Sequence, residues 1–146
     1  MESVRIYEIP ACRMVSSGSG MFGDGVLERF MEWMDAQPRT MFPRDFLSFD
    51  GQGFVWYYIY EEGMRVPDSL KIADFAGGLY AVASGRDGDE ADAAAAKAAI
   101  RAFIEESGCF ERDMSRAELG NVITPPSAQQ AMGYEQMDYY VPIRVK

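Results

Sequence analysis

The stretch that decides the fold is LKIADFAGGLYAVASGRDG, residues 70–88, because it repeats the pattern of the N-terminal segment. The earlier copy, residues 4–18, reads VRIYEIPACRMVSSG. In both copies an alternating, extended segment is interrupted by small residues or proline, becomes apolar, and ends at a glycine-rich turn before a helical pattern. The aligned pairs are Ile6 with Ile72, Glu8 with Asp74, Ile9 with Phe75 and, after a one-residue slip, Val15 with Val82, Ser17 with Ser84 and Gly18 with Gly85. Two copies indicate a duplicated half-domain and not a solenoid, with half-repeats of roughly residues 1–66 and 67–146.

The length and composition are those of one domain, covering residues 1–146. A chain of 146 residues that is 48% hydrophobic can bury a sizeable core. It contains no apolar run of about 20 residues that would span a membrane. The N-terminal MESVRIYEIP lacks the basic and apolar regions of a secretory signal. We therefore expect a cytoplasmic protein.

The charged residues and the missing histidine exclude several function classes. With 23 acidic and 14 basic residues, the net charge of −9 argues against a nucleic-acid-binding surface. The charge suits a cationic ligand or a basic protein partner, although many ordinary soluble domains are equally acidic. Because the chain has no histidine and Cys12 lies far from Cys109, we expect two ordinary thiols, no zinc site and no cofactor. Catalysis by Ser-His-Asp or Cys-His groups is excluded as well.

Hydrophobic periodicity predicts the same order of elements in each half: strand, helix, strand, strand. In the first half these are a strand over 4–16 that bends at Pro10, a helix of about a dozen residues from Val26 with Asp24 as N-cap, and strands over 45–49 and 54–62. In the second half they are strands over 70–75 and 79–84, a helix capped by Asp87 or Asp89 and ended by Gly108, a strand over 110–122, a polar loop over 125–136, and a last strand over 137–145. This order favours an α+β fold with antiparallel sheets.

The strand FVWYYIYEE, residues 54–62, carries the clearest chemical pattern. Side chains alternate along a strand, so Phe54, Trp56, Tyr58 and Tyr60 share one aromatic face. Two interpretations stand side by side. The face is either a core surface, because aromatic residues favour strands and bury large areas, or a wall that contacts a ligand, because tyrosine is amphipathic.

Two further motifs have a functional and an ordinary interpretation. Residues 18–23, GSGMFG, match the glycine spacing of a dinucleotide fingerprint, but the prolines and short strands that follow do not fit a parallel βαβ unit. We therefore interpret residues 18–25 as a flexible loop that binds no phosphate. Glu118 in RAELGN lies in the predicted strand over 110–122, where an acid is usually a solvated edge residue. Facing aromatic side chains, it would instead anchor a cation or act as a general acid/base.

Four segments together resemble the GyrI-like small-molecule-binding family, also known as the AraC-type or bacterial transcription activator effector-binding domain. EIPACRMV at 8–15 is similar to its opening strand, and FAGGLYAVASG at 75–85 is similar to the segment before its second helix. FIEESGCFERDMSRAELGN at 103–121 resembles the helix end and the strand with the family glutamate, which falls on Glu118. MDYYVPIRV at 137–145 resembles its closing strand.

The resemblance implies a tandem strand–helix–strand–strand duplication, with a cleft between the half-repeats that binds small aromatic or cationic molecules. In multidrug-responsive members the glutamate pairs with lipophilic cations among aromatic residues. That role would fall to Glu118, with aromatic contacts from Trp56, Tyr58, Tyr80 and Tyr140. Some stand-alone relatives hydrolyse cyclopropane-containing genotoxins, so a hydrolase using Glu118 is an alternative.

The sequence departs from the family pattern in two ways. Phe103 stands where many members have tryptophan, and we find no helix-turn-helix segment, so we expect a stand-alone domain and not a complete transcription regulator. A protein-interaction module, such as a topoisomerase inhibitor, is a second alternative to ligand binding. The favoured partner is a lipophilic small molecule, with neither nucleic acid nor a membrane as a direct partner. The oligomeric state is left open.

Overall fold

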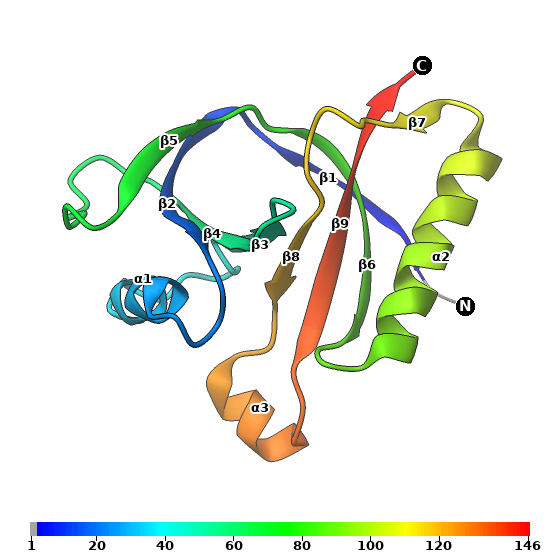
Figure 1. Ribbon diagram of the computed structural model, residues 1–146. Coiled ribbons are helices and arrows are strands. Elements are labelled where there is room, and N and C mark those ends of the chain that lie inside the picture. Colours follow the sequence, from blue (N-terminus) through cyan, green and yellow to red (C-terminus); the bar gives the residue numbers. More distant parts are fainter. Residues whose placement is uncertain (1–2) are drawn as a thin grey trace. The chain divides into compact units, whose positions relative to one another are not determined.

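The computed structural model describes residues 3–146, which form nine strands and three helices (Figure 1). In chain order these are β1 (Arg5–Ile9), β2 (Cys12–Gly20), α1 (Val26–Asp35), β3 (Asp45–Phe49), β4 (Phe54–Ile59), β5 (Lys71–Phe75), β6 (Gly78–Arg86), α2 (Glu90–Ser107), β7 (Phe110–Arg112), β8 (Leu119–Val122), α3 (Pro126–Met132) and β9 (Gln136–Val145). The strands pair antiparallel within each compact unit, which confirms the predicted α+β class.

The chain forms two compact units, and each takes one strand from the opposite half of the sequence. The first unit combines the segment up to Ile9 with Gly78–Lys146, and the second is Pro10–Gly77. The first contains the strand order β1-β6-β9-β8, with β7 also paired to β9, and the second contains β3-β4-β2-β5. Figure 1 shows β1 beside β6 and β5 beside β2, the two equivalent pairings of the duplicated segment.

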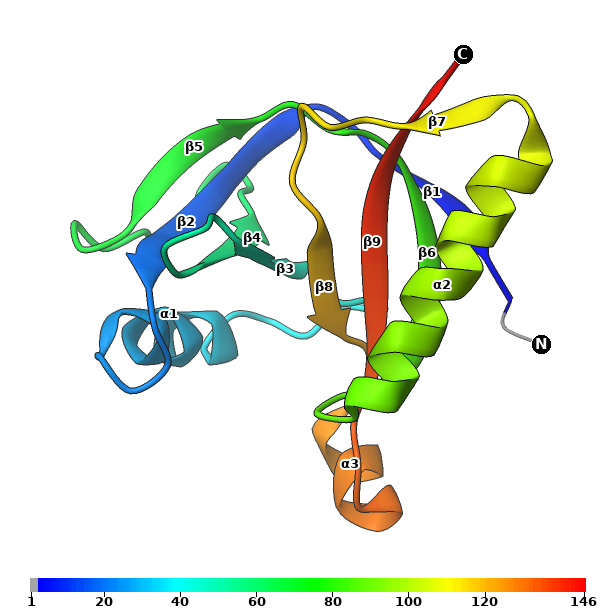
Figure 2. The same ribbon diagram turned by 45° about the vertical axis from the view of Figure 1, so that its right-hand side comes forward.

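Helix α2 covers one face of the first unit, alongside β6 and β9 (Figure 2). The small residues of α2 allow the helix to lie close to the sheet, and the side chains between helix and sheet are buried. This core contains Ala81, Ala83, Ala96, Ile100, Val141 and Ile143. Asp89 is the N-cap, because its carboxylate accepts a hydrogen bond from the Asp92 backbone N–H at 3.0 Å, and Gly108 ends the helix. The predictions for this helix are confirmed, with Asp89 chosen over Asp87.

Helix α1 covers β2 and β4 in the second unit, with a core of Val15, Phe30, Tyr58 and Leu70. The predicted N-cap Asp24 is wrong, because Gly25 holds that position in a left-handed conformation. The Asp24 carboxylate instead accepts hydrogen bonds from the N–H groups of Met21 and Val26. Glu28 accepts those of Gly23 and Gly25, so two carboxylates organise this loop. These backbone hydrogen bonds lower the pKa of both acids.

Two predicted elements are wrong for local reasons. The strand over 110–122 breaks after Arg112, because Asp113 binds the Ser115 backbone N–H and the Arg116 guanidinium and turns the chain. The hydrogen bonds from Ser115 and Arg116 hold the pKa of Asp113 far below its ordinary value. The polar loop over 125–136 contains helix α3, which has Pro126 in its first turn, where no backbone N–H is needed.

The glycine-rich segment does not have the context of a dinucleotide site. Gly18 and Gly20 lie within β2, which pairs antiparallel with β4 and β5 where a nucleotide fold would supply parallel strands. Over the described residues, no helix has both the length and the apolar character needed to cross a membrane.

Candidate functional site

The candidate site is the sheet face of the first unit that lies opposite α2. Since Ala81 and Val141 point toward α2, their neighbours Tyr80 and Tyr140 point to the other face. Tyr7 of β1 is in register with Tyr80 and joins them. Ring centroids lie 5.9 Å apart for Tyr80 and Tyr140 and 6.2 Å apart for Tyr7 and Tyr140. We call these three residues the tyrosine face. Tyr80 and Tyr140 are only 1% and 6% exposed.

Tyr140 is a neutral phenol that is held by a neighbouring amide. Burial raises the pKa of Tyr140 to about 12, while the Asn121 amide, which donates a hydrogen bond to its hydroxyl, acts in the opposite direction. Asn121 of β8 is in register with Asp138 of β9, so its side chain lies on the tyrosine face. The hydroxyl of Tyr140 is therefore protonated at neutral pH and does not supply a negative charge.

A buried carboxylate lies on the same face and already has its counter-ion. Asp138 is 3% exposed, and its Oδ1 lies 2.8 Å from Nη2 of Arg5. The Ser84 hydroxyl donates a second hydrogen bond to this oxygen. Arg5 also donates to the hydroxyl of Tyr7 at 2.8 Å. The cluster therefore links β1, β6 and β9 and carries no unpaired charge.

Arg116 binds the segment between β7 and β8 to the backbone of β6 and β9. Its Nη2 donates to the carbonyl oxygens of Leu79 at 3.0 Å and Ile143 at 2.7 Å, and its Nε bonds Asp113. The guanidinium carbon lies 4.8 Å from the Tyr80 ring centroid, close enough for a cation–π contact. Gly78 makes room for the guanidinium, since a β-carbon there would lie 2.6 Å from Nη1.

Glu118 lies in this segment and not within a strand. Its carboxylate is 3.4 Å from Nη2 of Arg112, and its side chain is 40% exposed. The predicted placement of Glu118 in a strand is wrong, because β8 begins at Leu119, which is in register with Tyr140. Leu119 and Asn121 thus lie on the tyrosine face. Parity counted from Leu119 would have identified Asn121, which sequence reasoning missed.

Trp56 and Tyr58 belong to the second unit and pack against α1. The Trp56 ring stacks on Phe30 with centroids 5.8 Å apart, and Tyr58 meets Trp33 edge-on at 5.6 Å. Of the two interpretations of this aromatic strand, the packing favours the core surface. The Trp56 indole N–H also donates to Asp45 at 2.9 Å. Burial raises the pKa of Asp45, and this hydrogen bond only partly offsets the effect. The structure thus brings Tyr80 and Tyr140 together and places Trp56 and Tyr58 in a different cluster.

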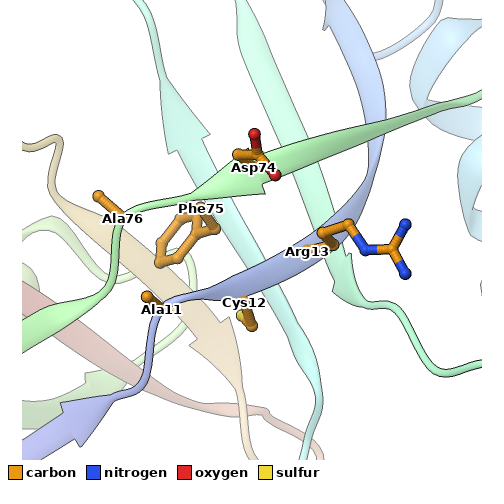
Figure 3. A pocket seen from close by; sticks show the side chains of 6 residues that line it. All are labelled: Ala11, Cys12, Arg13, Asp74, Phe75 and Ala76. Carbon is orange, nitrogen blue, oxygen red and sulfur yellow. The ribbon is translucent and has the colours of Figure 1, made fainter.

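The second unit has a shallow hollow at its β2–β5 edge, where Cys12 is the reactive residue type (Figure 3). Its lining consists of Ala11, Cys12, Arg13, Asp74, Phe75 and Ala76. Burial raises the pKa of Cys12, which favours the unreactive thiol over the thiolate. Among residues 3–146, no three side chains of Cys, Asp or Glu come together in a way that could hold a metal ion.

Comparison with known proteins gives structural similarity without sequence similarity. No family model and no curated protein matches the chain. The EcmrR C-terminal domain matches with a TM-score of 0.64 at 12% identity, over 99% of this chain and 98% of that one. A hydrolase from Listeria innocua matches with a TM-score of 0.67 at 11% identity, over 97% and 92% of the two chains. The structure of SAV2435 bound to tetraphenylphosphonium matches with a TM-score of 0.55 at 11% identity, over 97% and 94%.

These similarities establish the fold of the chain. The chain shares its α+β fold with these three structures over nearly the whole length of this chain and of each neighbour. Identities of 11–12% carry no information about which ligand or reaction the neighbours share with it.

Proposed function

We propose that this chain binds small aromatic organic molecules, and that Tyr80 and Tyr140 supply the main contact surface. The observation that carries the proposal is the tyrosine face itself, where buried aromatic rings are combined with oriented hydrogen-bonding groups. A core that only packs the fold is usually built from purely apolar side chains, because each buried polar group needs a hydrogen-bond partner. Tyrosine offers an apolar ring and a polar tip, which suits recognition of flat organic ligands.

The structural neighbours support this proposal at the level of the fold. The SAV2435 structure contains tetraphenylphosphonium, an aromatic cation, so this architecture can accommodate such a molecule. The EcmrR C-terminal domain has the same fold at 12% identity. We therefore regard the chain as an effector-binding type of domain, in which Glu118 is a partly exposed charge outside the main aromatic contact.

The experiment compares two neighbouring tyrosines that point in opposite directions. Tyr140 lies on the tyrosine face, whereas Tyr139 points toward α2 and has the Lys97 ammonium 5.8 Å from its ring centroid. Acridone, a neutral fluorophore, and rhodamine 6G, a cationic one, are titrated with the parent chain, Tyr140→Leu and Tyr139→Leu. Circular dichroism and thermal unfolding establish that each variant is folded.

Loss of one aromatic contact corresponds to a roughly 2–10-fold change in affinity. We expect Tyr140→Leu to weaken binding by at least this factor and Tyr139→Leu to leave it nearly unchanged. Equal effects of the two substitutions, or no binding of either dye below about 1 mM, would contradict the proposal.

The hydrolase alternative has weaker support. One neighbour is described as a hydrolase, but its identity to this chain is 11%. Glu118 would have to act as the general acid/base, yet it is ion-paired with Arg112 and 40% exposed. Turnover of a strained electrophile that is lost in Glu118→Gln would restore this alternative.

A further inference from the structure

The Asn121 carboxamide has one hydrogen-bonding group in use and one without a partner. Its amide donates to the Tyr140 hydroxyl, but within residues 3–146 nothing donates to its Oδ1. The residue is 4% exposed, and an acceptor buried without a partner is destabilising. Such groups are rare in native proteins and call for a specific explanation. On a ligand-binding face, the explanation is a donor supplied by the ligand.

The charges on the same face limit the class of ligand. The Asp138 carboxylate is matched by Arg5 at 2.8 Å, and the Arg116 guanidinium is matched by Asp113 at 2.9 Å. Glu118 is paired with Arg112 and partly exposed, outside the buried cluster. A cation placed against Tyr140 would have to separate Asp138 from Arg5 or remain without a counter-ion, and either arrangement is costly in a buried site. An uncharged ligand avoids both costs.

We infer, on the basis of the proposed function, that the ligand is an uncharged aromatic molecule with an N–H or O–H donor. Asn121 Oδ1 accepts a hydrogen bond from this donor, and the aromatic ring of the ligand packs on Tyr140. The Tyr140 hydroxyl keeps the carboxamide in place, because it holds the amide nitrogen and leaves the oxygen toward the ligand. Asn121 is thus the specificity-determining residue of the face.

The test uses a pair of ligands that differ in one donor. Acridone has a ring N–H, and xanthone has the same tricyclic shape with an oxygen at that position. The affinity of the full chain for acridone is measured by fluorescence, and xanthone and tetraphenylphosphonium are measured by displacement of acridone. We expect acridone to bind at least about fivefold more tightly than xanthone, because xanthone leaves Asn121 Oδ1 unpaired. Tetraphenylphosphonium, a cation without a donor, should bind more weakly than acridone.

Variants assign the preference to Asn121. In Asn121→Leu, which keeps the approximate volume, the ratio of xanthone to acridone dissociation constants should fall to about one. In Tyr139→Leu, on the opposite face, the ratio should remain as in the parent. The parent comparison decides the matter if Asn121→Leu does not fold.

The outcomes separate this inference from the proposed function. If acridone and xanthone bind equally well to the parent, the assignment of Asn121 is overturned while the proposed function stands. Tighter binding of tetraphenylphosphonium than of acridone overturns the uncharged class. If none of these molecules binds, the proposed function fails and the inference fails with it.

Discussion

Substituting Gly78 with alanine tests the contact that fixes the segment leading into β8. A β-carbon at residue 78 would lie 2.6 Å from Nη1 and 2.7 Å from Cζ of Arg116. The glycine also has a φ of +127°, which an L-residue rarely adopts. Both the backbone conformation and the space at Gly78 are therefore incompatible with alanine.

The expected cost follows from the contacts that must change. The unfavourable backbone conformation costs about 1–3 kcal/mol. Movement of Arg116 would break its hydrogen bonds to the carbonyl oxygens of Leu79 and Ile143, each worth about 1.5–3 kcal/mol because the donor is charged. Since relaxation recovers part of this loss, we expect Gly78→Ala to lower the free energy of unfolding by about 3–5 kcal/mol, with a decrease in Tm of roughly 10 °C.

The assay is urea-induced unfolding, with Gly88→Ala as the matched control. Gly88 has a φ of +80°, but no atom lies within 4 Å of a β-carbon placed there. The control therefore measures the cost of a positive φ without any steric contact. In an Arg116→Ala background, Gly78→Ala should cost less than in the parent background, because the obstructing guanidinium is gone. If Gly78→Ala lowers the free energy of unfolding no more than Gly88→Ala does in the parent background, the proposed steric conflict between residue 78 and Arg116 is wrong.

Two further substitutions test the charges assigned above. Burial raises the pKa of Asp45, so the folded state holds this proton more tightly than the unfolded state and Asp45 reduces stability as pH rises through the ordinary aspartate range. Asp45→Asn, which can still accept the Trp56 hydrogen bond, should therefore raise Tm at pH 7, with the gain vanishing near pH 3; a gain that persists at pH 3 would argue against burial of the charge as its cause. Glu118→Gln breaks only a partly exposed pair with Arg112, so we expect a stability change within about 1 kcal/mol and a loss of rhodamine 6G affinity of no more than about threefold. A tenfold loss would contradict the placement of the main contacts at Tyr140 and Asn121.

The parts of the fold that sequence predicted are those set by local chemistry. The strand Asp45–Phe49 has the predicted bounds, and α2 has the expected cap at Asp89 and end at Gly108. Each depends on a short pattern whose physical cause lies within a few residues. The repeat pattern also predicted two equivalent halves, but not that β1 would pair with β6, because pairing partners far apart in sequence leave no local signal.

The site was harder to predict from the sequence, because its geometry depends on the residue at which β8 begins. A carboxylate at Asp113 binds Ser115 and Arg116, ends β7, and thereby shifts the alternation of the following residues. A shift of one residue reverses every side chain of a strand. As a result Glu118 lies outside the strand in which it was predicted, and Asn121 lies on the tyrosine face. Tyr80 and Tyr140 could be predicted to lie together, because their alternation is uninterrupted along β6 and β9.

The most direct test of the central claim is a crystal structure of the chain with acridone bound. Our account predicts that the acridone ring lies against Tyr80 and Tyr140, with its N–H within hydrogen-bonding distance of Asn121 Oδ1. Acridone in the hollow beside Cys12 and Phe75, with the tyrosine face unoccupied in the same crystals, would contradict it.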